Sequence, residues 1–290
     1  MTVGIACSAG GFKGAFVSGV LTALEAAGVR ADAYAGASSS ALPAAYSAIG
    51  EVAALDGADF WQRAWRNFER SGSMSTAYRQ GIDELVPRLR QSLFDDDASR
   101  LLIPANEITN ELAATRAQGD GYTRLGRELL LAIRDRDRSW ADENLRLHVF
   151  DSQAEQEDAL TTANLEDVLY STSRYLHGAW DQPAWVGGLP FIDAVYTEAC
   201  PAGPLVNCGA HRVLVIANDP GPVSSDFFRS DELTSPFRGA VLEWIQPARP
   251  LTSWGIDVMQ ANEAGLLAVY KHGRAQAQAY LARGGADSWA

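Results

Sequence analysis

Two short apolar runs, each followed at once by a loop of small residues and then by a helical pattern, occupy the first fifty residues. The first run, Val3–Cys7, is too short for a helix and ends in a glycine-bearing loop. The stretch Ala15–Ala27 has apolar residues at helical spacing, and Gly28 stands where a helix commonly ends. A short strand over Ala33–Ala35 and a second helix over Ala41–Ile49 follow. This alternation predicts an α/β sheet with helices on both faces.

The rest of the chain continues this pattern after a long helical stretch. Residues 52–140 carry several helical stripes of apolar and aromatic side chains, and we expect no strand there. Strands are predicted at Leu145–Phe150 and His211–Ala217, with a shorter one ending at Ile192, and a final helix is predicted over Asp257–Leu281. With 290 residues, 47% of them hydrophobic, the chain can form one substantial core or two smaller ones.

Charge and composition exclude several classes of protein. The formal net charge is -12, with 36 acidic against 24 basic residues, so we expect no nucleic-acid partner and at most transient membrane contact. No stretch approaches the roughly 18 to 20 apolar residues of a membrane-spanning helix, and the N-terminus lacks a secretory signal, which favours a cytoplasmic protein. The three cysteines form no CxxC pair and no zinc-spaced cluster, so we expect buried thiols and no metal.

A serine lies in the small-residue turn Gly36-Ala37-Ser38-Ser39-Ser40, between a predicted strand and a predicted helix. Such a turn lifts the Ser38 hydroxyl out of the sheet and points it along the start of the next helix. The free backbone N–H groups there and the positive end of the helix dipole favour a developing oxyanion. Ser38 is therefore a candidate nucleophile, although a turn of small residues with no catalytic role is an equally simple explanation.

The loop Ser8–Gly14, also between a strand and a helix, is a candidate anion-binding loop. A dinucleotide fingerprint fits poorly because its first glycine is out of place, although Asp32 lies near the required spacing. A phosphate-binding P-loop would need Ser or Thr after Gly-Lys, which is absent. An oxyanion loop fits best, because the next strand leads directly to the serine turn.

Three acids at strand ends could serve as the base for the serine. Asp193 ends a short apolar run, and an aspartate there can accept the serine proton directly. Asp151 and Asp219 have similar positions, and any one of the three could simply form a turn. In a histidine-based triad of the α/β-hydrolase order, only His211 or His272 could follow the acid, but such folds place several strands before the serine turn and here one strand precedes it.

Taken together, these stretches resemble the patatin-like phospholipase family. That family has a GGGxRG-type oxyanion loop, then a GxSxG turn some twenty residues later, then a DG[AG] motif far downstream. Ala9–Gly14, Gly36–Ser40 and Asp193-Ala194 fall in this order. Four flanking segments are also similar to the family: Gly19-Val20-Leu21, Ala27-Gly28, Ser171-Thr172-Ser173 and Tyr270-Lys271-His272-Gly273.

The resemblance implies a three-layer αβα fold with a central, mostly parallel sheet. It implies a single domain over residues 1–290, with the helical insertion at about 52–140. It also implies a Ser–Asp dyad without histidine, metal or cofactor, acting on an acyl ester or lipid-like small molecule. Ser38 would attack the ester and Asp193 would take its proton. The oxyanion would be held by the N–H groups of Gly10, Gly11 and Ser39, and the supporting loop residues would be Ala9, Lys13, Gly14 and Gly36.

Four positions differ from the family pattern. Ala9, Ser40 and Ala194 replace glycines, and Lys13 replaces arginine in a chain with only one other lysine, Lys271. All four residues are small or keep the charge. These differences leave three functions open: a serine acyl hydrolase, an acyltransferase or ester-cleaving or ring-closing enzyme on a specialised acyl substrate, and a non-catalytic binding protein that keeps the fold.

Overall fold

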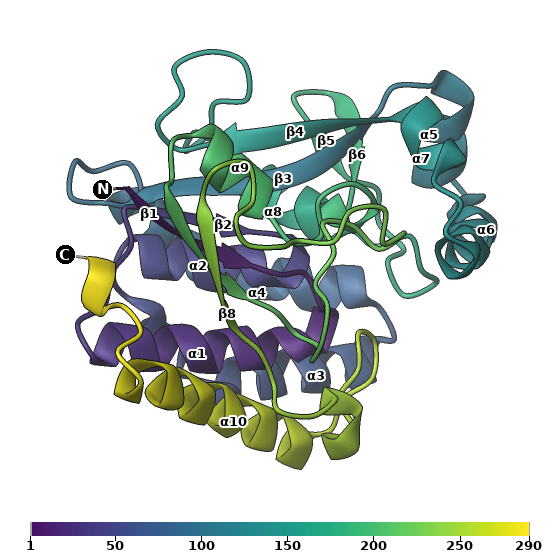
Figure 1. Cartoon of the computed structure of the whole chain (residues 1–290). Helices are drawn as coiled ribbons and strands as arrows, with labels where there is room; N and C mark the ends of the chain where they lie inside the picture. Colours follow the sequence, from purple (N-terminus) through teal and green to yellow (C-terminus); the bar gives the residue numbers. More distant parts are fainter. Residues whose placement is uncertain (1, 290) are drawn as a thin grey trace.

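The computed structural model describes residues 2–289 as a sheet covered by helices on both faces (Figure 1). The strands of this part of the chain are β1 (Val3–Cys7), β2 (Ala33–Gly36), β3 (Arg100–Ile108), β4 (Leu145–Asp151), β5 (Trp185–Val186), β6 (Leu189–Ile192), β7 (Arg212–Ile216) and β8 (Val241–Ile245). Its α-helices are α1 (Gly14–Ala26), α2 (Ala41–Ala48), α3 (Ala58–Ser71), α4 (Met74–Ser92), α5 (Glu111–Gln118), α6 (Tyr122–Asp135), α7 (Ser139–Asn144), α8 (Leu165–Ser173), α9 (Ala202–Asn207) and α10 (Glu263–Ala282).

Strand β1 lies in the middle of the sheet, between β2 and β7 and parallel to both. The strand order is β5-β6-β3-β2-β1-β7-β8, and β4 pairs with β3 beside this path. The pairs β2–β3 and β7–β8 are also parallel, whereas β4 and β6 run antiparallel to β3, and β5 runs antiparallel to β6. The predicted mostly parallel sheet and three-layer α/β fold are confirmed.

The side chains of β1 alternate between two separate cores. Ile5 and Cys7 belong to the larger core, which lies between the sheet and helices that include α1, α2 and α10. Ala6 belongs to a smaller core on the opposite face, where Leu205 of the short helix α9 packs. Because alternate residues of a strand point to opposite faces, a strand that is buried on both faces is apolar throughout.

Helices α1 and α10 pack against each other at two glycines. A Cβ atom at Gly19 of α1 would lie 2.1 Å from the carbonyl oxygen of Tyr270, and one at Gly273 of α10 would lie 2.2 Å from that of Phe16. Any larger residue would therefore push the helices apart. The two sequence segments that contain these glycines, at the start and the end of the chain, are thus neighbours in the fold.

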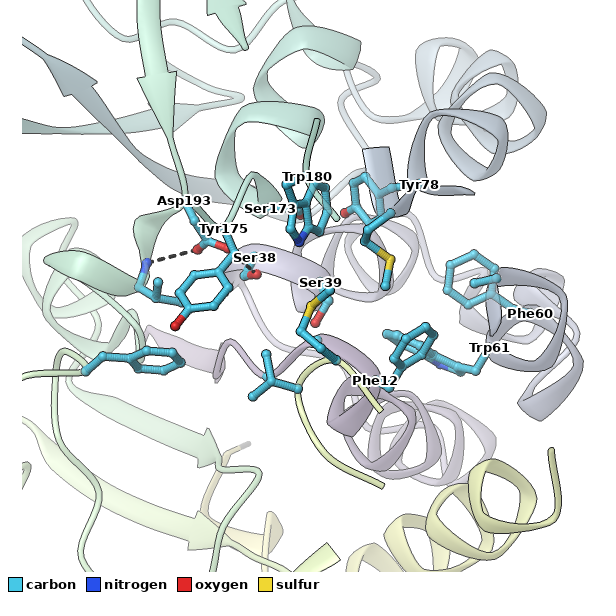
Figure 2. A pocket seen from close by; sticks show the side chains of 18 residues that line it. Phe12, Ser38, Ser39, Phe60, Trp61, Tyr78, Ser173, Tyr175, Trp180 and Asp193 are labelled. Carbon is cyan, nitrogen blue, oxygen red and sulfur yellow. Dashed lines mark hydrogen bonds between the residues drawn. The ribbon is translucent and has the colours of Figure 1, made fainter. Parts of the chain in front are cut away.

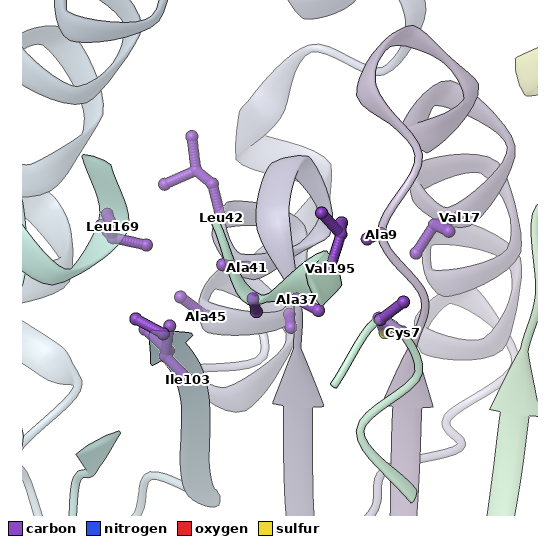
Figure 3. Close-up of a cluster of buried hydrophobic side chains, with 14 of the residues drawn as sticks. Cys7, Ala9, Val17, Ala37, Ala41, Leu42, Ala45, Ile103, Leu169 and Val195 are labelled. Atoms are coloured by element: carbon purple, nitrogen blue, oxygen red, sulfur yellow. The ribbon is translucent and has the colours of Figure 1, made fainter. Parts of the chain in front are cut away.

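Small side chains let α2 lie close to the strand that precedes it. Ala37, Ala41 and Ala45 are buried beneath the turn between β2 and α2, together with Ile103 and Leu169 (Figure 3). Alanine at three successive contact positions keeps the helix near the sheet, so the turn between them is sharp. This packing determines where the turn presents its serines.

The expectation that residues 52–140 contain no strand is wrong. The nine-residue strand β3 lies inside that interval and joins β2 in the main sheet. Pro104 lies within the run, and because proline cannot donate a ladder hydrogen bond, this stretch is a poor sequence signal for a strand. In the fold, β2 pairs with β3 only as far as Leu102, so Pro104 lies beyond that ladder. The remaining segments of this interval form α3 to α6 and the start of α7.

The other predicted elements agree closely with the structure. The strands expected at 145–150 and 211–217 correspond to β4 and β7, and the one ending at Ile192 is β6. The final helix corresponds to α10, which begins at Glu263, six residues later than predicted. The edge strand β8 was not predicted, since Glu243 interrupts its short apolar run. Within residues 2–289, no helix has both the length and the apolar character that crossing a bilayer requires.

Candidate active site

Ser38 occupies a strained position between β2 and α2. It begins a short 3-10 turn, Ser38–Ser40, and its backbone has φ 55, in the left-handed region that residues other than glycine rarely adopt. The Ser38 amide donates a hydrogen bond to the Thr172 hydroxyl at 3.0 Å, and this hydroxyl donates to the Pro104 carbonyl at 2.6 Å. Strain of this kind persists only where the surroundings hold it, and it occurs often at functional sites.

The Ser38 hydroxyl donates a hydrogen bond to Asp193, 155 residues further along the chain. Ser38 Oγ and Asp193 Oδ2 are 2.7 Å apart, and Asp193 Oδ1 accepts from the Val195 amide at 2.9 Å. The backbone of Asp193 is also held, because Asn106 Nδ2 donates to its carbonyl at 2.7 Å and its amide donates to the Arg174 carbonyl at 3.0 Å. The carboxylate is therefore fixed in position against the serine.

Burial controls the ionisation of this carboxyl group. Asp193 is only 1% exposed, and within residues 2–289 it forms no ion pair. Desolvation raises the pKa of Asp193 from 3.8 to about 7, although its hydrogen bonds from Val195 and Ser38 lower it in part. A carboxyl group with a pKa near neutrality can both accept and return a proton under physiological conditions.

The loop after β1 presents free amides beside the serine. In the described chain, the N–H groups of Gly10, Gly11 and Ser39 have no hydrogen-bond acceptor, and all three residues line one cavity with Ser38. Gly11 has φ 56, and a Cβ atom there would lie 2.0 Å from the Val258 carbonyl oxygen. Only glycine therefore fits at this point of the loop.

Two polar side chains hold this loop from the carboxyl end of β7. Asn218 Nδ2 donates to the carbonyls of Ser8 and Ala9, at 2.8 and 3.1 Å. Lys13 Nζ lies 3.0 Å from Asp219 Oδ1 and 3.4 Å from Asp257 Oδ1. Lys13 therefore ties the loop to two neighbouring segments and does not pair with Asp193. Asn218 was not predicted from the sequence as a site residue, although the adjacent Asp219 was a candidate.

At three positions the chain has another residue where the family pattern has glycine, and none of these positions requires a glycine. Ala9, Ser40 and Ala194 all lie outside the left-handed region in the described chain, and Ser40 has φ -87. The Ser40 hydroxyl donates to the Ser8 carbonyl at 2.7 Å, which joins the serine turn directly to the glycine loop. Ser40 thus adds a contact that glycine could not make.

The remaining two positions of the predicted supporting loop are closely packed. A Cβ atom at Gly36 would lie 2.7 Å from the Ala41 Cα atom, and one at Gly14 would lie 2.5 Å from the Trp61 ring and 3.1 Å from Ser39 Oγ. Both glycines therefore let the backbone come close to its neighbours around the serine turn.

The rival acids and the histidines have other partners. Asp151 forms an ion pair with Arg100, and Asp219 pairs with Lys13. His148 contacts Glu107 and Asp158, and His272 Nε2 accepts from the Ala248 amide. Along the described chain, no histidine lines the cavity that holds Ser38, so a histidine-based triad has no support here.

A narrow apolar cavity leads away from Ser38 and Asp193 toward Phe60 and Trp61 of α3 (Figure 2). Its volume is about 50 Å³, enough for roughly four water-sized groups. Aromatic and other apolar residues form most of its wall: Phe12, Phe60, Trp61, Ala64, Met74, Tyr78, Tyr175, Trp180, Val195, Phe227, Val258 and Met259. Because α3 and α4 provide one side, the stretch predicted as a helical insertion shapes this pocket.

The structure thus combines a three-layer α/β fold with a buried serine–carboxylate pair beside free amides, an arrangement typical of an acyl-transfer site. A family model, Patatin-like phospholipase, matches residues 5–206. The chain belongs to the patatin-like phospholipase family. Membership in this family indicates lipid acyl hydrolase activity, the hydrolysis of lipid esters in general. No curated protein compared with the chain gives a significant match.

Proposed function

We propose that this protein is a serine acyl hydrolase in which Ser38 is the nucleophile and Asp193 is its general base. The observation that carries the proposal is the 2.7 Å hydrogen bond from Ser38 Oγ to Asp193 Oδ2. Two features of the surroundings support it: the carboxylate is desolvated, and free amides lie in the same cavity. Serine is a weak nucleophile at neutral pH unless an adjacent base removes its proton.

In the first half of the proposed reaction, Ser38 Oγ attacks the ester carbonyl carbon while its proton passes to Asp193. The carbonyl oxygen gains negative charge, which the amides of Gly10, Gly11 and Ser39 stabilise. The intermediate collapses when the bond to the alcohol breaks, and Asp193 returns the proton to the leaving oxygen. Removing one donor from such an oxyanion site costs about 100- to 1000-fold in rate.

In the second half, water resolves the acyl-enzyme. Asp193 takes a proton from the attacking water, the same amides hold the oxyanion, and Ser38 Oγ leaves with the proton from Asp193. The acid is released and the serine is regenerated. One group with a pKa near 7 can take part in both halves, because its basic and acidic forms are both populated at neutral pH.

A fluorophosphonate probe, which labels activated serines, tests the assignment. The wild-type protein should be labelled, and Ser38→Ala should not. Ser47→Ala is the matched control, because Ser47 is another buried serine, its hydroxyl has no partner within residues 2–289, and it lies outside the cavity. This control should be labelled like the wild type.

Two results would count against the proposal. A wild-type protein that takes up no label would favour a binding protein that keeps the fold, and persistent labelling of Ser38→Ala would move the nucleophile elsewhere. Turnover of p-nitrophenyl esters by the wild type, with and without an added alcohol acceptor, then separates hydrolysis from acyl transfer.

A further inference from the structure

Four polar groups in the wall of this largely apolar cavity have no hydrogen-bond partner within residues 2–289. One is Ser39 Oγ, in the residue after Ser38, and the other three are Tyr78 OH, Ser173 Oγ and Trp180 Nε1, which we call the donor cluster. All three atoms of the cluster are buried. Ser173 lies close enough to the Tyr78 hydroxyl to interact with it, but that pair still leaves one hydroxyl proton, and the Trp180 N–H, without an acceptor within residues 2–289. Buried polar groups are nearly always hydrogen-bonded, and an unpaired one bears its full desolvation penalty. Such groups together in one cavity indicate that a ligand completes them.

The donor cluster lies on one side of the cavity and comes from three different segments. Tyr78 belongs to α4, Ser173 ends α8, and Trp180 lies in the loop that follows α8. The rings of Tyr78 and Trp180 are neighbours, with centroids 5.7 Å apart. Figure 2 labels all three on one side of the pocket, with Phe12, which follows Gly11 in the loop, on the other side. The cluster is thus separate from the amides proposed to hold the reacting carbonyl oxygen.

The chemistry of the wall defines the group that would bind there. Among the described lining residues, Asp193 is the one charged side chain, and none is Lys, Arg or His. A carboxylate or phosphate would therefore lack a counter-charge in this apolar space. The Trp180 indole can only donate, and the hydroxyls of Tyr78 and Ser173 can donate as well. A neutral carbonyl oxygen, which accepts through two lone pairs, satisfies such donors.

We propose that the acyl chain of the substrate carries a second carbonyl oxygen, which the donor cluster binds, so that the enzyme prefers oxo-acyl esters to plain alkyl esters. This inference rests on the proposed function, because it places the acyl group of an ester bound at Ser38 in the cavity. The small volume of the cavity limits the chain to a few heavy atoms beyond the ester.

Matched pairs of p-nitrophenyl esters test the preference: 4-oxopentanoate against pentanoate, and 5-oxohexanoate against hexanoate. Each kcat/KM is divided by the rate of hydroxide-catalysed hydrolysis of the same ester, which removes differences in intrinsic reactivity. For at least one pair the oxo ester should be preferred about tenfold or more. Tyr78→Phe and Trp180→Phe should each reduce that ratio about fivefold, the usual effect of losing one hydrogen bond. Tyr270→Phe, a matched change in α10 outside the cavity, should leave the ratio unchanged.

A ratio near one in both pairs, unaffected by Tyr78→Phe, would overturn the inference and assign the donor cluster to bound water. A second measurement keeps the test independent of catalysis. The Ser38→Ala variant should bind methyl 4-oxopentanoate or methyl 5-oxohexanoate more tightly by calorimetry than it binds the matching alkyl ester. Equal binding would refute the inference even if turnover supports the hydrolase. Tighter binding of an oxo ester, in a protein whose wild type takes up no fluorophosphonate label, would support binding of the second carbonyl by the donor cluster and refute the proposed function.

Discussion

Replacing Asp193 with asparagine should stabilise the folded protein at alkaline pH while it removes activity. Burial raises the folded-state pKa of Asp193 from 3.8 to about 7. Between these values the unfolded chain has lost the proton that the folded protein still holds. The stability that this group contributes is therefore complete below about pH 4 and is lost as the pH rises through about 7.

The magnitude follows from the width of this pH window. From pH 5 to the folded-state pKa is about two units, and each unit is worth about 1.4 kcal/mol. The wild type should thus lose about 3 kcal/mol between pH 5 and pH 9 through this one group. Asparagine does not titrate, and its side-chain oxygen can still accept from the Val195 amide. From pH 5 to pH 9, the difference in unfolding free energy between Asp193→Asn and the wild type should therefore shift by about 3 kcal/mol in favour of the variant.

Urea unfolding of both proteins at pH 5 and pH 9, followed by tryptophan fluorescence, measures this shift. Asp219→Asn is the control, because that carboxylate is 63% exposed and pairs with Lys13 at the surface. The effect of this substitution on the unfolding free energy should differ by less than about 1 kcal/mol between pH 5 and pH 9. A difference between Asp193→Asn and the wild type that is the same at both pH values would refute the reasoning. In the absence of urea, Asp193→Asn should reduce kcat at least about 100-fold relative to the wild type.

Three further predictions concern the same site. The kcat/KM of the wild type for an uncharged ester should rise with pH through an apparent pKa near 7, because Asp193 must be ionised to accept the serine proton; a flat profile from pH 5 to pH 9 would contradict this. Gly11→Ala should cost more than about 2 kcal/mol in urea unfolding and at least about 100-fold in kcat, since its Cβ would overlap the Val258 carbonyl. Gly28→Ala, also at positive φ but in open space, should cost only about 1 kcal/mol and keep its activity, and equal effects in the two variants would argue against the clash. The wild type should prefer the butyrate to the octanoate p-nitrophenyl ester. Phe60→Ala enlarges the end of the cavity away from Ser38 and should raise the octanoate-to-butyrate ratio of kcat/KM at least about tenfold. An unchanged ratio would mean that the acyl chain lies elsewhere.

The differences from the family pattern have a local structural basis. The hydroxyl of Ser40 bonds to the Ser8 carbonyl, and Ala9 and Ala194 adopt backbone conformations that suit any residue. At Gly11, where glycine is sterically required, the chain agrees with the family pattern. These differences are therefore compatible with an intact site.

The sequence by itself determined the local architecture around the site. The order of strand, glycine loop, helix, strand, small-residue turn and helix could be predicted because each element has its own periodicity and its own terminating residues. The structure agrees within one or two residues, with α1 at Gly14–Ala26 and α2 at Ala41–Ala48. Strand β3 escaped prediction because Pro104 interrupts its pattern, and the reason that a proline is tolerated there depends on where the neighbouring strand stops pairing.

Only the tertiary structure decided which acid meets the serine and what the cavity contains. Asp151, Asp193 and Asp219 had similar positions in the sequence, but the packing of β6 beside β3 brings Asp193 to Ser38 and leaves the other two in ion pairs. The donor cluster likewise forms from segments of α4, α8 and the loop after α8. Backbone periodicity is a property of neighbouring residues, so it can be predicted from the sequence. Desolvation, pKa and unpaired donors depend on contacts between distant residues, and only the packing of the whole chain creates them.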